Sequence, residues 1–267
     1  MLVVTVLSRK GGVGKTSVVL GLAGAALATG RRALVVDLDP QANATAALDP
    51  PDVRRTIVDV FADARPGSLA SAATPSGWGD AVGVVTAEAE LAGSDHPGLQ
   101  AGETRLRVAM NGLAKRGGYD VVLVDCPPSL GRLTTNGLAA GHLALIVAEP
   151  TLFALLGAQQ AIAAVEVVRR KHNLRLQPAG IVVNRMRPGL AEHRYRLAEL
   201  TEAYGHLVLS PPIPERSAID KAQGAGVPVQ RWPSPGARDA ARIYGAYLER
   251  LLAAATDRGP LTRSRKR

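Results

Sequence analysis

Cysteine and aromatic residues are both scarce in this chain of 267 residues. Its single cysteine, Cys126, excludes a disulfide within the chain, and a cysteine-based zinc or iron–sulfur site would need a second chain. Aromatic residues make up 3%, so the core must be aliphatic, and extended stacking on nucleic-acid bases is not expected. No uncharged apolar run reaches about 18 residues, and apolar residues precede basic ones at the N-terminus, the reverse of a secretory signal. We therefore expect a cytoplasmic protein.

Positive charge, by contrast, is abundant and unevenly placed. The formal net charge is +9, and the surplus of Lys and Arg lies in residues 169–196 and in the last ten residues. Clustered basic residues favour a polyanionic partner such as DNA or an anionic membrane. The alternative interpretation is a solvated helix face followed by a basic tail.

Apolar runs alternate with segments of helical pattern along the chain. The runs predict strands at residues 2–7, 33–36, 82–85, 121–124, 144–148 and 180–183, and they leave a short strand at 207–209 open. Helices are predicted at residues 16–28, 106–115, 155–171, 191–204 and 237–255, and residues 63–81 predict an irregular excursion. This alternation indicates an α/β fold, with a doubly wound, mostly parallel sheet flanked by helices on both faces. We expect one domain over residues 1–255 and a flexible basic tail over 256–267.

Polar residues recur where the predicted strands end. They are Lys10, Asp37, Asp39, Asp125 and Asn184. In an open α/β sheet the ligand binds at this edge, so these side chains are candidate site residues.

The junction between the first predicted strand and helix is rich in glycine and lysine. It reads Lys10-Gly11-Gly12-Val13-Gly14-Lys15-Thr16-Ser17. Glycines let backbone N–H groups turn toward phosphate oxygens there, and the helix N-terminus adds a positive dipole end. Lys15 would reach the β- and γ-phosphates, and the Thr16 hydroxyl would ligate Mg²⁺. The strict pattern G-x-x-x-x-G-K-[ST] is not met, because Arg9 stands at its first glycine.

The run K-G-G-V-G-K-T resembles the deviant Walker A motif of the ParA/MinD group of P-loop ATPases. The resemblance implies that residues 10–17 bind ATP, and that Lys10 reaches across the interface of an ATP-dependent homodimer to the partner's phosphates. Residues 37–43 resemble the family's D-x-D-P-Q-G-N segment, with Ala42 where glycine is usual. This similarity implies that Asp39 orients the attacking water, while Asp37 supports the magnesium shell. Lys10, Lys15 and Asp39 are therefore the catalytic candidates.

Two further segments extend the resemblance over nearly the whole chain. Asp125-Cys126-Pro127-Pro128-Ser129-Leu130-Gly131 resembles the family's Walker B segment, which implies that Asp125 holds Mg²⁺ through water and Cys126 is a small buried residue. Asn184 stands where relatives often contact adenine, although a turn-forming Asn at a strand end is the alternative. Pro214 opens a loop that, by resemblance, approaches the base and ribose. The family's Glu-Ala pair is replaced there by Asp220-Lys221-Ala222.

The resemblance implies a DNA-segregating ATPase of the ParA type, with ATP and Mg²⁺ as cofactors. Such a protein binds double-stranded DNA nonspecifically as an ATP dimer at the nucleoid, and a ParB-like protein stimulates its weak hydrolysis. The DNA-binding candidates are the basic tail and Arg185, Arg187 and Arg194, which belong to the basic stretch at or after Asn184. Arg216 and Lys221 are added as substitutes, because Ala218 stands where relatives carry a basic residue. No helix-turn-helix is expected before the phosphate loop, as in short Soj-like members.

Three alternatives stay open at this point. One is an ATPase of the same group that positions another cargo or acts at a membrane as MinD does. We expect no membrane partner, because the tail has one leucine, no aromatic residue and an interrupting Pro260. The second is a metabolic relative such as an ATP-dependent amide ligase or a reductase component. The third is a module that binds nucleotide without turnover.

Overall fold

A seven-stranded sheet forms the centre of the computed structural model, which describes residues 1–92, 102–116 and 118–256. Its order is β3-β4-β2-β5-β1-β6-β7, and every neighbouring pair is parallel except β3 with β4. The strands are β1 (Leu2–Leu7), β2 (Ala33–Asp37), β3 (Thr74–Ser76), β4 (Gly79–Val85), β5 (Val121–Asp125), β6 (Leu143–Ala148) and β7 (Gln177–Val183). The predicted doubly wound, mostly parallel sheet is confirmed.

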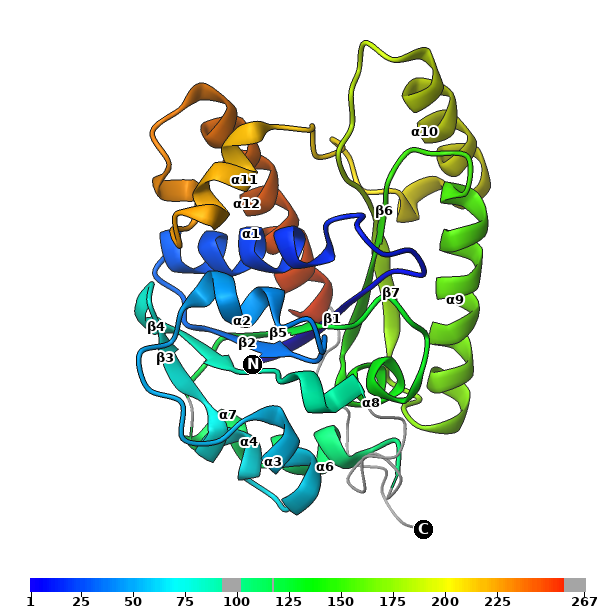
Figure 1. Cartoon of the computed structure of the whole chain (residues 1–267). Helices are drawn as coiled ribbons and strands as arrows, with labels where there is room; N and C mark the ends of the chain where they lie inside the picture. The colour runs from blue at the N-terminus through cyan, green and yellow to red at the C-terminus, as the bar shows by residue number, and fades with distance from the viewer. Residues whose placement is uncertain (93–101, 117, 257–267) are drawn as a thin grey trace.

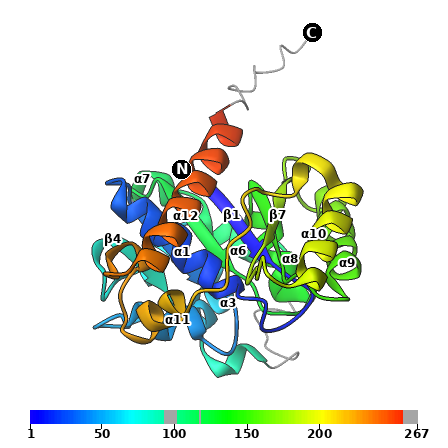
Figure 2. The ribbon, with the colours of Figure 1, turned by 90° about the horizontal axis from the view of Figure 1, so that it is seen from above.

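Helices cover both faces of the sheet (Figure 1). One face is packed by α1 (Lys15–Ala28), α2 (Asn43–Leu48), α11 (Ser217–Gly224) and α12 (Pro235–Thr256). The other is packed by α3 (Ile57–Asp63), α4 (Ser68–Ala72), α6 (Arg105–Met110), α7 (Leu113–Arg116), α8 (Arg132–Ala140), α9 (Ala154–Lys171) and α10 (Ala191–Tyr204). Short 3-10 turns lie at Ala89–Ala92, Gly205–Leu207 and Val229–Arg231. Seen from above, α9 and α10 lie on one flank, and α1 and α12 lie on the other (Figure 2).

The apolar runs form central strands because both of their faces are buried. In β1, Val4 and Val6 belong to the core on one face, whereas Val3 and Leu7 belong to the core on the other. Side chains alternate across a strand, so a strand covered on both sides must be apolar throughout. Helix α1 packs closely on α12, and a Cβ at Gly21 would lie only 2.4 Å from the Tyr244 ring. A small residue is therefore required at that crossing.

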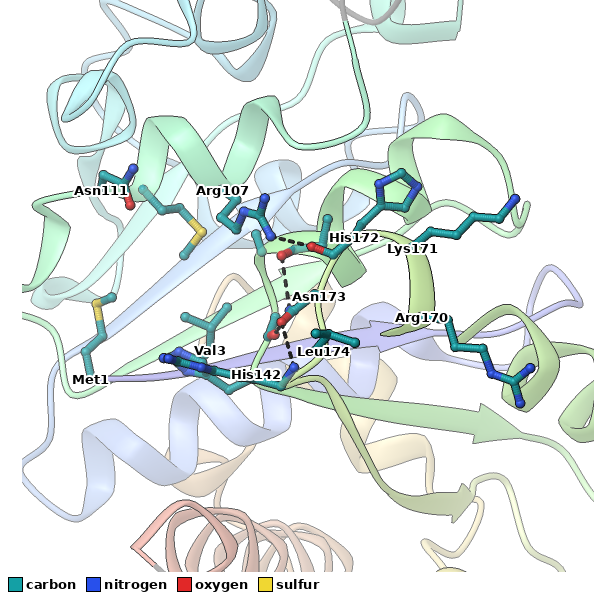
Figure 3. A pocket seen from close by; sticks show the side chains of 15 residues that line it. Met1, Val3, Arg107, Asn111, His142, Arg170, Lys171, His172, Asn173 and Leu174 are labelled. Carbon is teal, nitrogen blue, oxygen red and sulfur yellow. Dashed lines mark hydrogen bonds between the residues drawn. The ribbon is translucent and has the colours of Figure 1, made fainter. Parts of the chain in front are cut away.

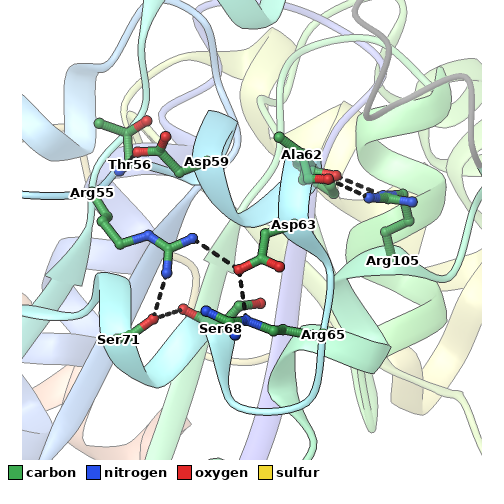
Figure 4. A network of polar contacts seen from close by, with 10 residues as sticks. Arg55, Thr56, Asp59, Ala62, Asp63, Arg65, Ser68, Ser71 and Arg105 are labelled. Atoms are coloured by element: carbon green, nitrogen blue, oxygen red, sulfur yellow. Dashed lines mark hydrogen bonds and ion pairs between the residues drawn. The ribbon is translucent and has the colours of Figure 1, made fainter.

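The prediction of an irregular excursion over residues 63–81 is wrong, because α4, β3 and the start of β4 lie there. A polar network connects α3 with α4 (Figure 4). The Asp63 carboxylate accepts hydrogen bonds from Arg55 at 3.2 Å and from Arg65 at 2.8 Å, and Arg55 also donates to Ser71 in α4. These partners fix short elements whose local sequence has little periodicity.

Smaller differences occur elsewhere. The helix predicted over 106–115 is divided into α6 and α7 at Gly112, whose φ is +85°. Residues 207–209 form no strand; the chain makes a 3-10 turn there and an isolated bridge between Val208 and Ile181. The predicted tail lies outside the described residues except for Thr256, where α12 ends. Among the described helices, none is long and apolar enough to cross a membrane.

Candidate functional site

The glycine-rich loop crosses the carboxyl edge of the sheet between β1 and α1. Gly12 and Gly14 have φ of +77° and +84°, in the left-handed region that glycine adopts without strain. Gly14 caps α1 without any side-chain hydrogen bond, so the first N–H groups of this 14-residue helix are open to a ligand. The loop borders a hollow of about 590 Å³, and Lys15, Thr16 and Asp39 also line it. This is the geometry of a phosphate-binding site.

Two carboxylates stand side by side beneath this loop. Asp37 and Asp125 end the neighbouring strands β2 and β5 and are paired in register. The Thr16 hydroxyl donates to one Asp125 oxygen at 2.7 Å, while the other oxygen is buried without a hydrogen-bond partner. Asp37 accepts from the Thr45 amide and hydroxyl at 2.9 and 2.8 Å. Burial raises the pKa of both carboxyls. The negative charge of Asp37 raises the pKa of Asp125 further, and that of Asp39 raises the pKa of Asp37, because like charges repel in a buried site.

These oxygen ligands fit a magnesium ion. The described residues contain no group of three or more His, Cys, Asp or Glu side chains that could hold a metal alone. Mg²⁺, however, is usually held by one or two carboxylates together with phosphates and waters. The unpaired oxygen of Asp125 and the hydroxyl of Thr16 are such ligands, and a cation there would favour the charged form of both aspartates.

Asp39 is buried beside the hollow and held by its own segment. Its amide donates to Asp37 at 3.0 Å, and its carboxylate accepts from the Gln41 amide at 3.0 Å. Ala42, the one residue that departs from the motif that this segment resembles, has a φ of +52°. The backbone therefore keeps the left-handed turn despite the Cβ of Ala42, and Asp39 still faces the hollow.

Asn184 braces the phosphate loop, a role that the sequence did not predict. Its side-chain amide donates to the Val13 carbonyl at 2.8 Å, although the two residues are far apart in sequence. Asn184 and Pro214 also line a smaller hollow of about 190 Å³, which shares Ser17 and Arg185 with the larger one. Contact of Asn184 and Pro214 with a base stays a prediction.

Helix α11 contributes a second residue that sequence reasoning missed. Gln223 accepts a hydrogen bond from the Ser17 hydroxyl at 3.3 Å and lines the larger hollow. The helix was not predicted, so Gln223 could not be placed at the site. Cys126 is fully buried, and burial raises the pKa of its thiol, as expected for a core residue rather than a nucleophile.

Lys10 does not line the larger hollow. Its ammonium group lies 3.8 Å from Glu149, its side chain is 53% exposed, and it borders a neighbouring crevice with Phe153. Phe153 and the adjacent Leu152 are both strongly exposed. The structure therefore places Lys15 inside the larger hollow and leaves Lys10 outside it.

The five basic candidates occupy three different settings. Arg185 and Arg216 line the smaller hollow, and Arg187 forms an ion pair with Glu215, which raises the pKa of Arg187 and lowers that of Glu215. Helix α10, which carries Arg194, and helix α11, which carries Lys221, lie on opposite flanks in both Figure 1 and Figure 2. Arg194 donates to the Pro188 carbonyl at 2.7 Å. Lys221 is exposed.

A glycine-rich loop at a helix N-terminus, with a threonine hydrogen-bonded to a buried aspartate beneath it, defines the P-loop class of nucleotide-binding proteins. A family model described as an AAA domain matches residues 1–178. The chain is 32% identical over 239 residues to the chromosome partitioning protein ParA of Caulobacter vibrioides, covering 85% of each. It is 29% identical over 233 residues to the sporulation initiation inhibitor protein Soj of Bacillus subtilis, covering 85% of this chain and 89% of Soj.

A solved structure shares the fold over most of the chain. It is that of cobyrinic acid a,c-diamide synthase from Mycobacterium smegmatis with bound ATP analog and magnesium. Its TM-score is 0.77 at 30% identity, over 95% of this chain and 97% of that one. The chain belongs to the ParA family of P-loop ATPases, as the resemblance predicted.

Proposed function

We propose that this protein is a Mg²⁺-dependent ATPase that dimerises on ATP, binds double-stranded DNA nonspecifically, and hydrolyses ATP when a ParB-like protein stimulates it. The observation that carries the proposal is the different placement of the two loop lysines. Lys15 belongs to this protomer's hollow, and Lys10 is exposed beside it. The nucleotide of a partner protomer that faces this edge of the sheet would be contacted by the ammonium group of Lys10.

The chemistry follows from charge placement. The loop N–H groups and Lys15 would hold the phosphates, and the Thr16 hydroxyl and the unpaired Asp125 oxygen would hold the ion. Bound Mg²⁺ neutralises charge on the transferred phosphoryl group. Asp39, fixed through the Gln41 amide, would accept a hydrogen bond from the attacking water and orient it. The smaller hollow beside Asn184 and Pro214 would receive the base and ribose.

Dimerisation is supported by the surface next to the loop. Leu152 and Phe153 are apolar residues beside the Lys10 crevice, and more than half of the surface of each is open to solvent. Their burial against a partner would stabilise a closed dimer. ATP between the protomers would add phosphate charges for the two Lys10 ammonium groups.

DNA binding is supported by the net charge of +9 and by the basic residues near the carboxyl edge of the sheet. Arg194 and Lys221 are the candidates to test first, because neither lines a nucleotide hollow and, unlike Arg187, neither has an ion-pair partner among the described residues. Arg185 and Arg216 line the smaller hollow and could serve nucleotide as well as DNA. A protein bound in this way would lie on the nucleoid in the cytoplasm.

The deciding experiment is a mobility shift with random-sequence duplex DNA, without nucleotide and with ADP or ATP–Mg²⁺, at two salt concentrations. Of the three conditions, we expect DNA binding only with ATP–Mg²⁺. We expect that binding to weaken steeply with salt, because contacts to DNA phosphates release counterions. Arg194→Ala with Lys221→Ala should weaken DNA binding while leaving ATP-dependent dimerisation intact. The matched control is Arg54→Ala with Arg242→Ala, two exposed arginines paired with Asp52 and Asp239. DNA binding that ignores nucleotide would contradict the proposal.

A second candidate function is ATP-dependent amide formation, favoured by the similarity to the Mycobacterium smegmatis synthase. The two functions separate in one assay. An amide-forming enzyme should release phosphate only with a carboxylate acceptor and a nitrogen donor, whereas a partition ATPase should respond to DNA and a partner protein. If glutamine were the donor, the buried Cys126 could not be its nucleophile.

A further inference from the structure

A second large hollow lies at the opposite edge of the sheet from the phosphate loop. Its volume is about 640 Å³, and its walls come from the start of β1, from α6, from the turn between α8 and β6, and from the turn after α9 (Figure 3). Strand β1 separates the two hollows, so they are about 20 Å apart at a rise of about 3.3 Å per residue. A ligand here would not touch bound nucleotide.

Hydrogen bonds fix the walls of this hollow. The Asn173 side chain donates to the carbonyls of Leu138, Ala139 and Gly141, at 3.3, 3.1 and 2.7 Å, and so fastens the end of α9 to the end of α8. The Val3 amide donates to the His142 ring at 3.0 Å, which joins β1 to the start of β6. A site whose framework is already ordered loses little entropy on binding.

Four formally charged cations line the hollow, and no carboxylate does so among the described residues that line it. They are Arg107, Arg170, Lys171 and Arg175. Arg107 donates to the His172 carbonyl at 2.5 Å, while Arg170 and Lys171 extend outward from the end of α9 (Figure 3). The nearby carboxylate of Glu103 lies 3.4 Å from the His172 ring.

These cations differ from many arginines elsewhere on the described surface. Arg31 and Arg55 have carboxylate partners, and so does Arg169, which precedes Arg170 on α9 and pairs with Glu166 at 3.1 Å. Within the described part of the chain, Arg170, Lys171 and Arg175 form no ion pair. Unpaired like charges around one concavity repel each other, and an anionic ligand would remove that repulsion.

Apolar surface is also open at this hollow. Leu174 is 81% exposed, and Met1 is exposed above the buried Val3 and Met110. A ligand that fits must therefore offer anionic groups to the rim and an apolar or aromatic part to these side chains.

We propose that this hollow binds a small organophosphate, a molecule in which one or more phosphate groups are attached to an apolar or aromatic part. The volume lies in the range of small-molecule sites, about 300–1,000 Å³. A concave, apolar-floored site suits such a molecule better than the convex backbone of duplex DNA. The inference is independent of the function proposed above, since none of these residues lines either hollow at the carboxyl edge.

The test is calorimetric titration of the full chain with 1-naphthyl phosphate and with inorganic pyrophosphate. In Arg170→Gln with Arg175→Gln, we expect the affinity for 1-naphthyl phosphate to fall about tenfold or more, because two charge-assisted contacts are removed. The matched control is Arg169→Gln with Arg54→Gln, two ion-paired arginines outside the hollow, whose affinity should be unchanged. Leu174→Ser should weaken 1-naphthyl phosphate binding and leave pyrophosphate binding unchanged.

Lys15→Ala identifies any contribution of the phosphate loop, and binding at the distal hollow should persist in that variant. Equal affinity in the Arg170–Arg175 variant and its control would overturn the proposal, and so would absence of binding at millimolar concentrations. The proposal would also be overturned if neither 1-naphthyl phosphate nor pyrophosphate bound the protein, and the Arg170–Arg175 variant lost binding to duplex DNA. This face would then be a DNA contact instead.

Discussion

Gly14 offers a quantitative test of how the phosphate loop is held. A Cβ added there would lie 2.2 Å from the side-chain nitrogen of Asn184, far inside van der Waals contact. That nitrogen donates to the Val13 carbonyl at 2.8 Å. Gly14→Ala must therefore push Asn184 away and break the bond that fastens the loop to the end of β7. Gly12→Ala is the matched control, because its φ is similar and no atom lies within 4 Å of its added Cβ.

The two substitutions should lower the free energy of unfolding by different amounts, and the difference is the cost of the clash with Asn184. A left-handed backbone costs about 1–2 kcal/mol for a residue with a Cβ, so Gly12→Ala should lower the free energy of unfolding by about that amount. Gly14→Ala adds the loss of a buried hydrogen bond, about 1–3 kcal/mol, for a total of about 2–5 kcal/mol. In Asn184→Ala the clash is absent, and Gly14→Ala should then cost only the backbone strain.

The assay is urea unfolding of the nucleotide-free protein, followed by tryptophan fluorescence of Trp78 and Trp232. The four proteins with and without Gly14→Ala and Asn184→Ala form a double-mutant cycle, whose coupling should be about 1–3 kcal/mol. If Gly14→Ala and Gly12→Ala were equally destabilising, Asn184 would not brace the loop. The same conclusion would follow from strict additivity in the cycle.

Three further predictions concern the core, the surface network and the site. Tyr244→Phe should leave stability unchanged or raise it by up to about 1 kcal/mol in urea unfolding, because the buried hydroxyl has no hydrogen-bond partner among the described residues. Arg55 and Arg65 lower the pKa of Asp63, so its stabilisation is complete above its ordinary pKa near 3.8 and is lost as pH falls through the lower folded value. Asp63→Asn should thus be less stable than the parent at pH 7 and indistinguishable in strong acid, as pH-dependent unfolding would show. Asp39→Ala should keep ATP and accumulate as a dimer on gel filtration, and unchanged phosphate release would remove Asp39 from the mechanism.

The central sheet could be predicted because its signal is local. Runs such as Val121–Asp125 are short, rich in valine and apolar at every position before the final aspartate, which is the pattern of a strand buried on both faces. The phosphate loop could also be predicted from the sequence, since glycine, lysine and threonine occur there at a strand-to-helix junction. The positions of Lys15, Thr16 and Asp125 follow from that junction and from the neighbouring ends of parallel strands.

Other parts depend on contacts between distant segments. Asn184 reaches Val13, and Gln223 reaches Ser17, across more than 170 residues in each case. No local pattern reports such a contact. Helix α4 depends similarly on arginine and aspartate side chains that tie it to α3 (Figure 4). The sequence therefore predicted which residues are polar at the edge of the sheet, but not which of them hold the loop in place.

The position of Lys10 suggests how one chain could remain incomplete until it meets another. Its ion pair with Glu149 is long, at 3.8 Å, and its side chain is half exposed, so the pair is worth at most about 1 kcal/mol. A phosphate group with two or more charges would compete easily for this ammonium group. The pair is thus too weak to keep Lys10 from a partner's nucleotide. Glu149→Gln should therefore leave ATP binding by the single protomer unchanged. Lys10→Ala should abolish ATP-dependent dimerisation and still allow ATP to bind at the phosphate loop.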